Sequence, residues 1–131
     1  MSRTRHALMF FFLFVFSVSV HAAESPHPVI LFDKGEAILQ RDQSVSDLTE
    51  ARTLFLTIIN KFPGSPLGYL GMSKLYRLQA RQDLRYDIET LKFKALPFAV
   101  KAMQLGPSIK AVHENYAFFR VIFEDHVRKL K

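Results

Sequence analysis

Residues 51–63 read Ala-Arg-Thr-Leu-Phe-Leu-Thr-Ile-Ile-Asn-Lys-Phe-Pro, and their spacing of small or apolar residues before a proline returns in residues 95–107. The shared positions are Ala51, Phe55, Ile58 and Pro63 in the first segment and Ala95, Ala99, Ala102 and Pro107 in the second. Self-similarity at a fixed spacing is the mark of a repeat architecture. The pattern therefore predicts helical repeats, a class of fold that usually binds other chains.

A second shared pattern follows each of the two prolines. Its members are Tyr69, Met72, Ser73 and Tyr76 after Pro63, and His113, Tyr116, Ala117 and Arg120 after Pro107. The second pattern therefore recurs together with the first, 44 residues further along the chain.

Apolar residues recur at three- and four-residue spacing along most of the chain, which is typical of amphipathic helices. We expect helices over residues 29–40, 47–60, 66–80 and 86–105, and from Ser108 almost to the end of the chain. Asp47, with Glu50 three residues on, resembles a capping box, and Ser108 is the expected cap of the last helix. The run 29–32 is a weak candidate for a strand.

Two features within these helices carry structural predictions. Gly68 and Gly71 lower helix propensity, and we expect them to allow close approach to a neighbouring helix. Pro97 lies inside the fourth helix and removes one backbone hydrogen bond, so it predicts a kink near Phe93 or Lys94.

The first 22 residues have the three-part pattern of a secretory signal. A basic start is followed by the apolar run 7–20 and by small residues at Val20 and Ala22. The run is shorter than the ~20 residues that span a bilayer as a helix. We expect cleavage after Ala22, leaving residues 23–131 as one exported domain, periplasmic or extracellular. An uncleaved segment that anchors the protein to the membrane is the alternative.

Composition narrows the classes of partner. Removal of the leader lowers the formal net charge from +6 to about +4, which suits an acidic partner but is not unusual for a soluble protein. The basic residues are dispersed, so we do not expect nucleic acid binding. The chain has no cysteine, which excludes disulfides, thiolate metal sites and a lipid anchor on an N-terminal cysteine.

On these residues the chain resembles the tetratricopeptide repeat (TPR) family. The resemblance implies an all-α fold, a short right-handed solenoid of helical hairpins with about two and a half repeats. The units would span residues 32–65 and 66–109, with a lone terminal helix over 110–131. The second unit is longer than the family standard, and we expect its extra residues, around 81–92, to extend the helical hairpin. So few units bury little surface, and oligomerisation would compensate.

The resemblance also implies a concave groove that holds a partner protein or peptide, acidic or apolar in character. The positions that match the groove are Leu70, Lys74, Arg77, Asn115, Phe118 and Ile122. Lys74 and Arg77 lie one helical turn apart and are suited to grip a carboxylate or phosphate, although a solvated basic face explains them equally well. Phe118 and Ile122 would provide apolar contact, or would simply be buried.

No pattern for catalysis or for a cofactor is present in the sequence. The histidines after the leader, His27, His113 and His126, are not paired at metal-ligand spacing. Nucleophile motifs and phosphate-cradling loops are also absent. We therefore expect no enzyme, no metal and no cofactor, and a function in protein binding or assembly. The alternative is a self-associating structural protein or a membrane-anchored scaffold of the cell envelope.

Overall fold

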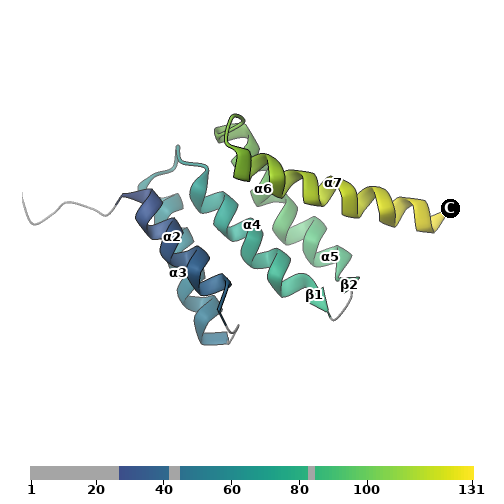
Figure 1. The fold of residues 1–131 in the computed structure, drawn as a ribbon, viewed down its shortest axis with the longest axis horizontal. Coiled ribbons are helices and arrows are strands. Elements are labelled where there is room, and N and C mark those ends of the chain that lie inside the picture. Colours follow the sequence, from purple (N-terminus) through teal and green to yellow (C-terminus); the bar gives the residue numbers. More distant parts are fainter. Residues whose placement is uncertain (1–26, 42–44, 83–84) are drawn as a thin grey trace, which may run out of the picture.

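The computed structural model describes residues 27–41, 45–82 and 85–131, which form a row of packed helices (Figure 1). The elements are α2 (Pro28–Leu39), α3 (Val45–Lys61), α4 (Leu67–Ala80), β1 (Arg81–Gln82), β2 (Arg85–Tyr86), α5 (Ile88–Thr90), η1 (Leu91–Ala95), α6 (Leu96–Leu105) and α7 (Lys110–Leu130). The described chain is thus all-α apart from one ribbon of two strands, each two residues long. The predicted leader, residues 1–22, lies outside the described residues.

The predicted helices are present with shifted ends. The run 29–32 is helical and begins α2, so the strand alternative is wrong. Helix α3 begins at Val45, before the predicted start at Asp47. Ser108 does not cap the last helix: the capping position is Ile109, in extended conformation and without a side-chain hydrogen bond. Ser108 lies instead in the turn before this helix. In that turn the Ile109 N–H donates a hydrogen bond to the Gly106 carbonyl oxygen, with 3.2 Å between the two heavy atoms.

At the place where Pro97 predicts a kink, the helix has a π-helical turn. Segments α5, η1 and α6 follow one another without a break, and η1 includes both Phe93 and Lys94. Within it the Leu96 N–H bonds the carbonyl of Leu91, five residues back rather than four. Because proline has no N–H and its ring crowds the carbonyl four residues earlier, the wider turn accommodates it without ending the helix.

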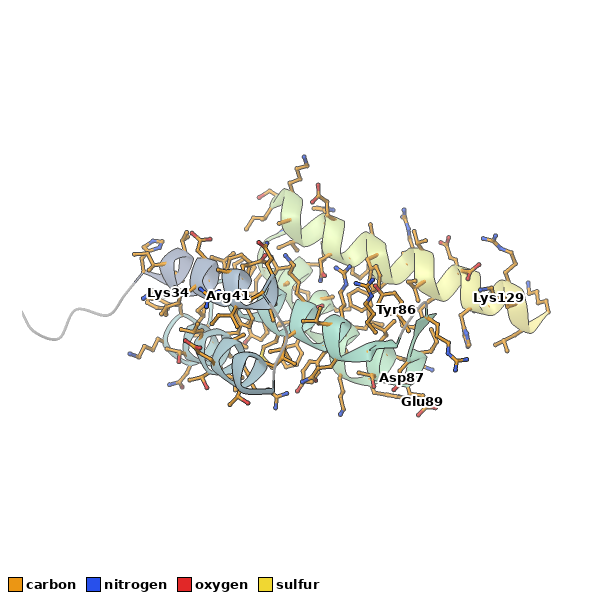
Figure 2. The ribbon with its side chains drawn as sticks, turned by 60° about the horizontal axis from the view of Figure 1, so that its bottom comes forward. Lys34, Arg41, Tyr86, Asp87, Glu89 and Lys129 are labelled. Atoms are coloured by element: carbon orange, nitrogen blue, oxygen red, sulfur yellow. The ribbon has the colours of Figure 1, made fainter. Side chains whose placement is uncertain are left out.

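The extra residues of the second unit do not extend the helical hairpin as predicted. Residues Arg81 and Gln82 pair with Tyr86 and Arg85 in an antiparallel ribbon. The Asp87 N–H then bonds the Ala80 carbonyl at 2.8 Å, which closes the ribbon at the end of α4. The Asp87 side chain caps α5 by accepting bonds from the Glu89 N–H and the Thr90 hydroxyl. Tyr86, Asp87 and Glu89 are labelled in Figure 2.

Each helix packs against the next one along the chain, and α4 also contacts α2 and α7. The core has three clusters: one between α2, α3 and α4 around Phe55, one between α4, η1 and α7 around Phe119, and one joining Leu70, Ala102 and Val112. The small or apolar positions of the repeated pattern are all buried: Ala51, Phe55, Ile58, Ala95, Ala99 and Ala102. The repeated spacing therefore marks helix contacts in both units.

The predicted close approach at the glycines of α4 is confirmed. A Cβ atom at Gly68 would lie 2.9 Å from the carbonyl oxygen of Phe55 and 3.0 Å from the nitrogen of Ile59, both backbone atoms of α3. A Cβ atom at Gly71 would overlap the ring of Phe55, and so would one at Gly35 of α2. The Phe55 ring thus occupies space that only two glycines leave open.

Among the described residues, no helix combines the length and the apolar character needed to cross a membrane.

Candidate functional site

A polar network joins α4 to α7 at the centre of the molecule. The Asn115 amide donates to the Ser73 hydroxyl at 2.9 Å, and the Arg77 guanidinium donates to the Asn115 carbonyl oxygen at 2.7 Å. Ser73 is fully buried and Asn115 is only 4% exposed. Because buried polar groups are costly unless they are paired, this network orients the Asn115 amide and holds Arg77 at a defined position.

Arg77 is held from a second side by an aromatic ring. The central carbon of its guanidinium lies 3.6 Å from the centre of the Phe118 ring, close enough for a cation–π contact. Burial lowers the pKa of the Arg77 guanidinium, and the nearby Tyr86 opposes this shift. Arginine titrates so far above neutrality that Arg77 keeps its charge. The structure therefore presents a fixed, charged, planar donor.

Tyr86 extends this aromatic wall. Its ring meets Phe118 edge-on, with the centroids 5.2 Å apart and the planes at 71°, and Phe118 meets Phe119 in the same manner. The edge-to-face arrangement is one of the two preferred for aromatic pairs. The β1–β2 ribbon places Tyr86 there and so contributes directly to this surface.

Lys74 lies one turn before Arg77 on α4 and forms an ion pair with Glu36 of α2. Its side chain is about one-third exposed. The pair links the first predicted unit to the second across the same face that carries Arg77. Lys74 therefore already has an anionic partner within the chain, whereas the hydrogen-bond acceptor of Arg77 is a neutral amide.

A hollow of about 280 Å³ opens between these groups. Its lining comes from α2, α4 and the ribbon: Glu36, Leu39, Gln40, Lys74, Arg77, Leu78, Arg81 and Tyr86. The lining holds three cationic side chains and one carboxylate, so its formal charge is positive, and leucine and tyrosine side chains add apolar surface. Such a lining suits an anionic group attached to an apolar body.

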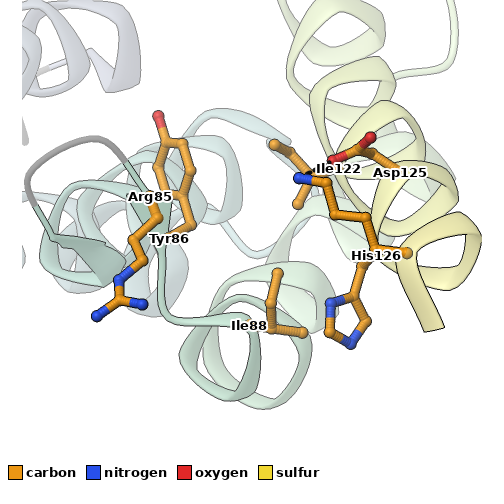
Figure 3. Close-up of a pocket in the computed structure, with 7 residues that line it drawn as sticks. Arg85, Tyr86, Ile88, Ile122, Asp125 and His126 are labelled. Atoms are coloured by element: carbon orange, nitrogen blue, oxygen red, sulfur yellow. Dashed lines mark ion pairs between the residues drawn. The ribbon is translucent and has the colours of Figure 1, made fainter.

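A second hollow of about 310 Å³ lies on the other side of Tyr86, between the ribbon, α5 and α7 (Figure 3). Arg85, Tyr86 and Ile88 form one wall, and Ile122, Asp125, His126 and Lys129 form the other. The Lys129 ammonium bonds the Asp125 carboxylate at 2.9 Å, and this bond lowers the pKa of Asp125. These two charges compensate each other, so the second hollow is less strongly cationic in character.

The structure brings together four of the six residues expected in the groove. Lys74 and Arg77 line the first hollow, while Asn115 and Phe118 hold Arg77 from behind. Ile122 lines the second hollow, beyond Tyr86. Leu70 is 1% exposed and packs with Ala102 and Val112, so it belongs to the core and not to an open surface.

Sequence reasoning did not assign three residues that shape this surface, namely Glu36, Ser73 and Tyr86. Ser73 belongs to the repeated pattern, but the pattern gave it no role in a site. Glu36 and Lys74 lie far apart in the sequence, and pairing at that distance leaves no local signal. Tyr86 depends on a ribbon of two-residue strands, which are too short to show an alternating pattern.

This surface combines cationic side chains with apolar ones. Over the described ranges, no group of three or more histidine, aspartate or glutamate side chains could hold a metal ion. Every buried side-chain nitrogen or oxygen in the described part of the chain has a hydrogen-bond partner. The network of Ser73, Asn115 and Arg77 is therefore satisfied internally and serves to position the guanidinium.

Comparisons with protein-family models, with curated proteins and with solved structures gave no match.

Proposed function

We propose that the protein is an exported, TPR-like interaction module that binds an acidic segment of a partner protein in the hollow lined by Lys74, Arg77 and Tyr86. Export follows from the leader pattern in residues 1–22. The TPR-like assignment follows from the two repeated spacings, with units over residues 32–65 and 66–109 and a terminal helix over 110–131.

The packing supports this arrangement of repeats. In a stack of helical hairpins, each unit contacts only its neighbours, and the first helices of successive units line one face. The contacts between α2 and α4, and between α4 and α7, are those expected of three successive first helices. Helices α3 and α6 would then be the second helices, which agrees with the buried positions Ala51 and Ala102.

The observation that carries the proposal is the fixed guanidinium of Arg77. A guanidinium has five N–H donors in a planar fork, so one bond to Asn115 leaves donors for a carboxylate. Because Asn115 and Phe118 already restrict the side chain, binding loses little further side-chain freedom, and preorganisation of this kind favours affinity. A structural role alone would not require a charged group at the wall of a hollow.

The lining also indicates what kind of segment fits. A partner carboxylate would meet Arg77, with Arg81 and Lys74 contributing to the positive potential. Adjacent apolar side chains would pack on Leu78 and Tyr86. Because charge across an interface mainly affects association rate and specificity, binding should weaken as salt is raised.

Cross-linking and co-purification from the natural host tests this proposal. The tagged wild type is compared with a variant carrying Lys74→Glu and Arg77→Glu, and with a control carrying Lys34→Glu and Lys101→Glu, two exposed lysines outside the hollow. A partner retained by wild type and control but lost from the first variant supports the proposal. Circular dichroism establishes that all three proteins are folded.

A third variant separates charge from geometry. Arg77→Lys keeps the positive charge but loses the planar fork, so we expect weaker capture than wild type and stronger capture than Arg77→Glu. A partner bound equally by all variants would remove the hollow from the site. Recovery of the protein only with itself would favour the alternative of a self-associating scaffold.

A further inference from the structure

Helix α7 presents an apolar surface on a side that does not face the hollow. Val127 is 52% exposed and Leu130 is 74% exposed. Tyr116, nearer the start of the same helix, is also exposed. Figures 1 and 2 show that the C-terminal part of α7 extends beyond the other helices, and Lys129 marks this part in Figure 2. We call the strip formed by Tyr116, Arg120, Phe123, Glu124, Val127, Arg128 and Lys131 the outer strip of α7.

The outer strip borders an apolar groove between α7 and the preceding helix. The groove has a volume of about 510 Å³, and its apolar lining is Ile88, Phe93, Leu96, Phe123, Val127 and Leu130. Phe93 is 65% exposed, which is unusual for so large an apolar side chain. In a helical repeat stack, a helix that follows α7 would lie here, and a terminal repeat normally has a polar outer face.

We infer that a second copy of this chain covers this groove, and that the two copies pair through antiparallel α7 helices. The pair Arg120 and Glu124 is self-complementary, which favours this occupant in the antiparallel orientation. Arg120 and Glu124 lie one turn apart near the middle of α7. A two-fold axis between them places each Arg120 beside Glu124 of the second copy, so two opposite-charge contacts form at once.

The other orientation is unfavourable. Parallel pairing of the same strips would set Arg120 against Arg120 and Arg128 against Arg128, and like charges in contact oppose association. In the antiparallel pair, Arg128 instead reaches Tyr116 of the second copy, where a guanidinium can stack on the ring. The apolar residues Phe123 and Val127 lie between these polar contacts, as in the core and rim of a protein interface.

The inference does not depend on the proposed function, because the outer strip and the hollow have no residue in common. The dimer and the hollow together would affect how a partner binds. A dimer would carry two hollows, and a partner with two acidic segments would bind it far more tightly than it binds one copy.

Sedimentation velocity of the purified protein over a range of concentrations tests the inference. We expect wild type to sediment as a dimer at high concentration. Val127→Glu combined with Leu130→Glu should reduce the mass to that of a single chain, because both side chains are exposed in the monomer and buried in the dimer. Val121→Glu is the matched control: Val121 is 60% exposed on α7 but lies outside both the outer strip and the groove, and the dimer should persist.

Charge exchange tests the partner and the orientation. Arg120→Glu alone and Glu124→Arg alone should each abolish the dimer. Each substitution turns both of the contacts between position 120 and position 124 into contacts between like charges. An equimolar mixture of the two variants should restore it, and so should the double exchange in one chain. Circular dichroism of each variant shows that the fold is retained, so a loss of mass reports association.

Two outcomes would overturn the inference. One is a wild type that remains a single chain at the highest soluble concentration, or a dimer that survives Val127→Glu with Leu130→Glu. The other is a photo-cross-linker at position 127 that captures a different protein in the host and never a second copy. Either result leaves the test of the hollow through Lys74 and Arg77 unaffected.

Discussion

Arg77 and Asn115 lie 38 residues apart in the sequence and are joined by a 2.7 Å hydrogen bond between their side chains. The bond connects α4 to α7, which also share the apolar clusters that contain Phe119 and Val112. Because Asn115 also bonds the buried hydroxyl of Ser73, the three residues act as one unit. This unit positions the guanidinium on which the proposed recognition depends.

Removal of Asn115 should therefore destabilise the fold as well as loosen the site. Asn115→Ala leaves Ser73 and Arg77 without their shared partner, and each unsatisfied buried group costs about 1–3 kcal/mol. Urea unfolding followed by circular dichroism gives the free energy of unfolding. The control is Gln104→Ala, an exposed amide of α6, which should change stability little. Equal effects of the two substitutions would show that the network does not stabilise the fold.

Gly71→Ala should destabilise the contact between α3 and α4. The new Cβ atom would overlap the ring of Phe55, and Gly35 lies on that ring as well, so the ring has little room to move. Overpacking of this kind typically costs about 1–3 kcal/mol. Gly64→Ala is a matched control, since a Cβ there would meet nothing within 4 Å. If Gly71→Ala unfolded at the same urea concentration as wild type, the close contact with Phe55 would be wrong.

Ala102→Leu should also overpack a helix contact, by about 1–3 kcal/mol. Ala102 is 1% exposed and packs with Leu70 and Val112, which come from α4 and α7. Val100→Leu adds bulk at an exposed position of the same helix and serves as the control. Thermal unfolding of both variants makes the comparison. A fully tolerated Ala102→Leu would mean that the predicted repeat register is incorrect.

Asp87 should make stability depend on pH in the acid range. The Thr90 hydroxyl and the Glu89 N–H donate to its carboxylate, and these bonds lower the pKa of Asp87. A carboxyl group whose folded pKa is lowered stabilises the fold above its unfolded pKa of about 3.9, and this stability is lost as the pH falls through the folded pKa. Asp87→Ala should therefore melt below wild type at neutral pH, and the difference should shrink in acid.

The control for Asp87 is Asp33→Ala on α2, an exposed aspartate with no capping bond among the described interactions. Its melting temperature should follow wild type more closely at both pH values. A difference between wild type and Asp87→Ala that is constant with pH would show that the loss is due to packing and not to the charge at the start of α5.

The sequence predicted the helices well because their patterns are local. The spacing of apolar residues, proline and glycine affects the backbone conformation only within a few residues of each position. The ends of α3, α4 and α6 therefore lie near the predicted ones. The π-helical turn at Leu91–Ala95 follows from Pro97 in the same way. The predictions that failed are the cap at Ser108, the strand alternative for 29–32 and the helical extension expected around 81–92.

The candidate site was only partly predictable. The resemblance to TPR repeats implied Lys74, Arg77, Asn115 and Phe118 as groove positions on two helices, but it did not distinguish an exposed position from a buried one. Leu70 shows this, since α4 turns it into the core. Tyr86 was missed because the ribbon that carries it has no periodic signal.

The sequence by itself determined the all-α class of the described chain, the order of its helices and the buried positions of the repeated pattern, because these depend on periodicity and on local backbone preferences. Only the tertiary structure decided which charged side chains have partners. Glu36 meets Lys74 and Asn115 meets Arg77 across helices distant in the chain. Such contacts depend on how helices stack, and the free energy that fixes the stack comes from burial summed over many residues and not from any short segment.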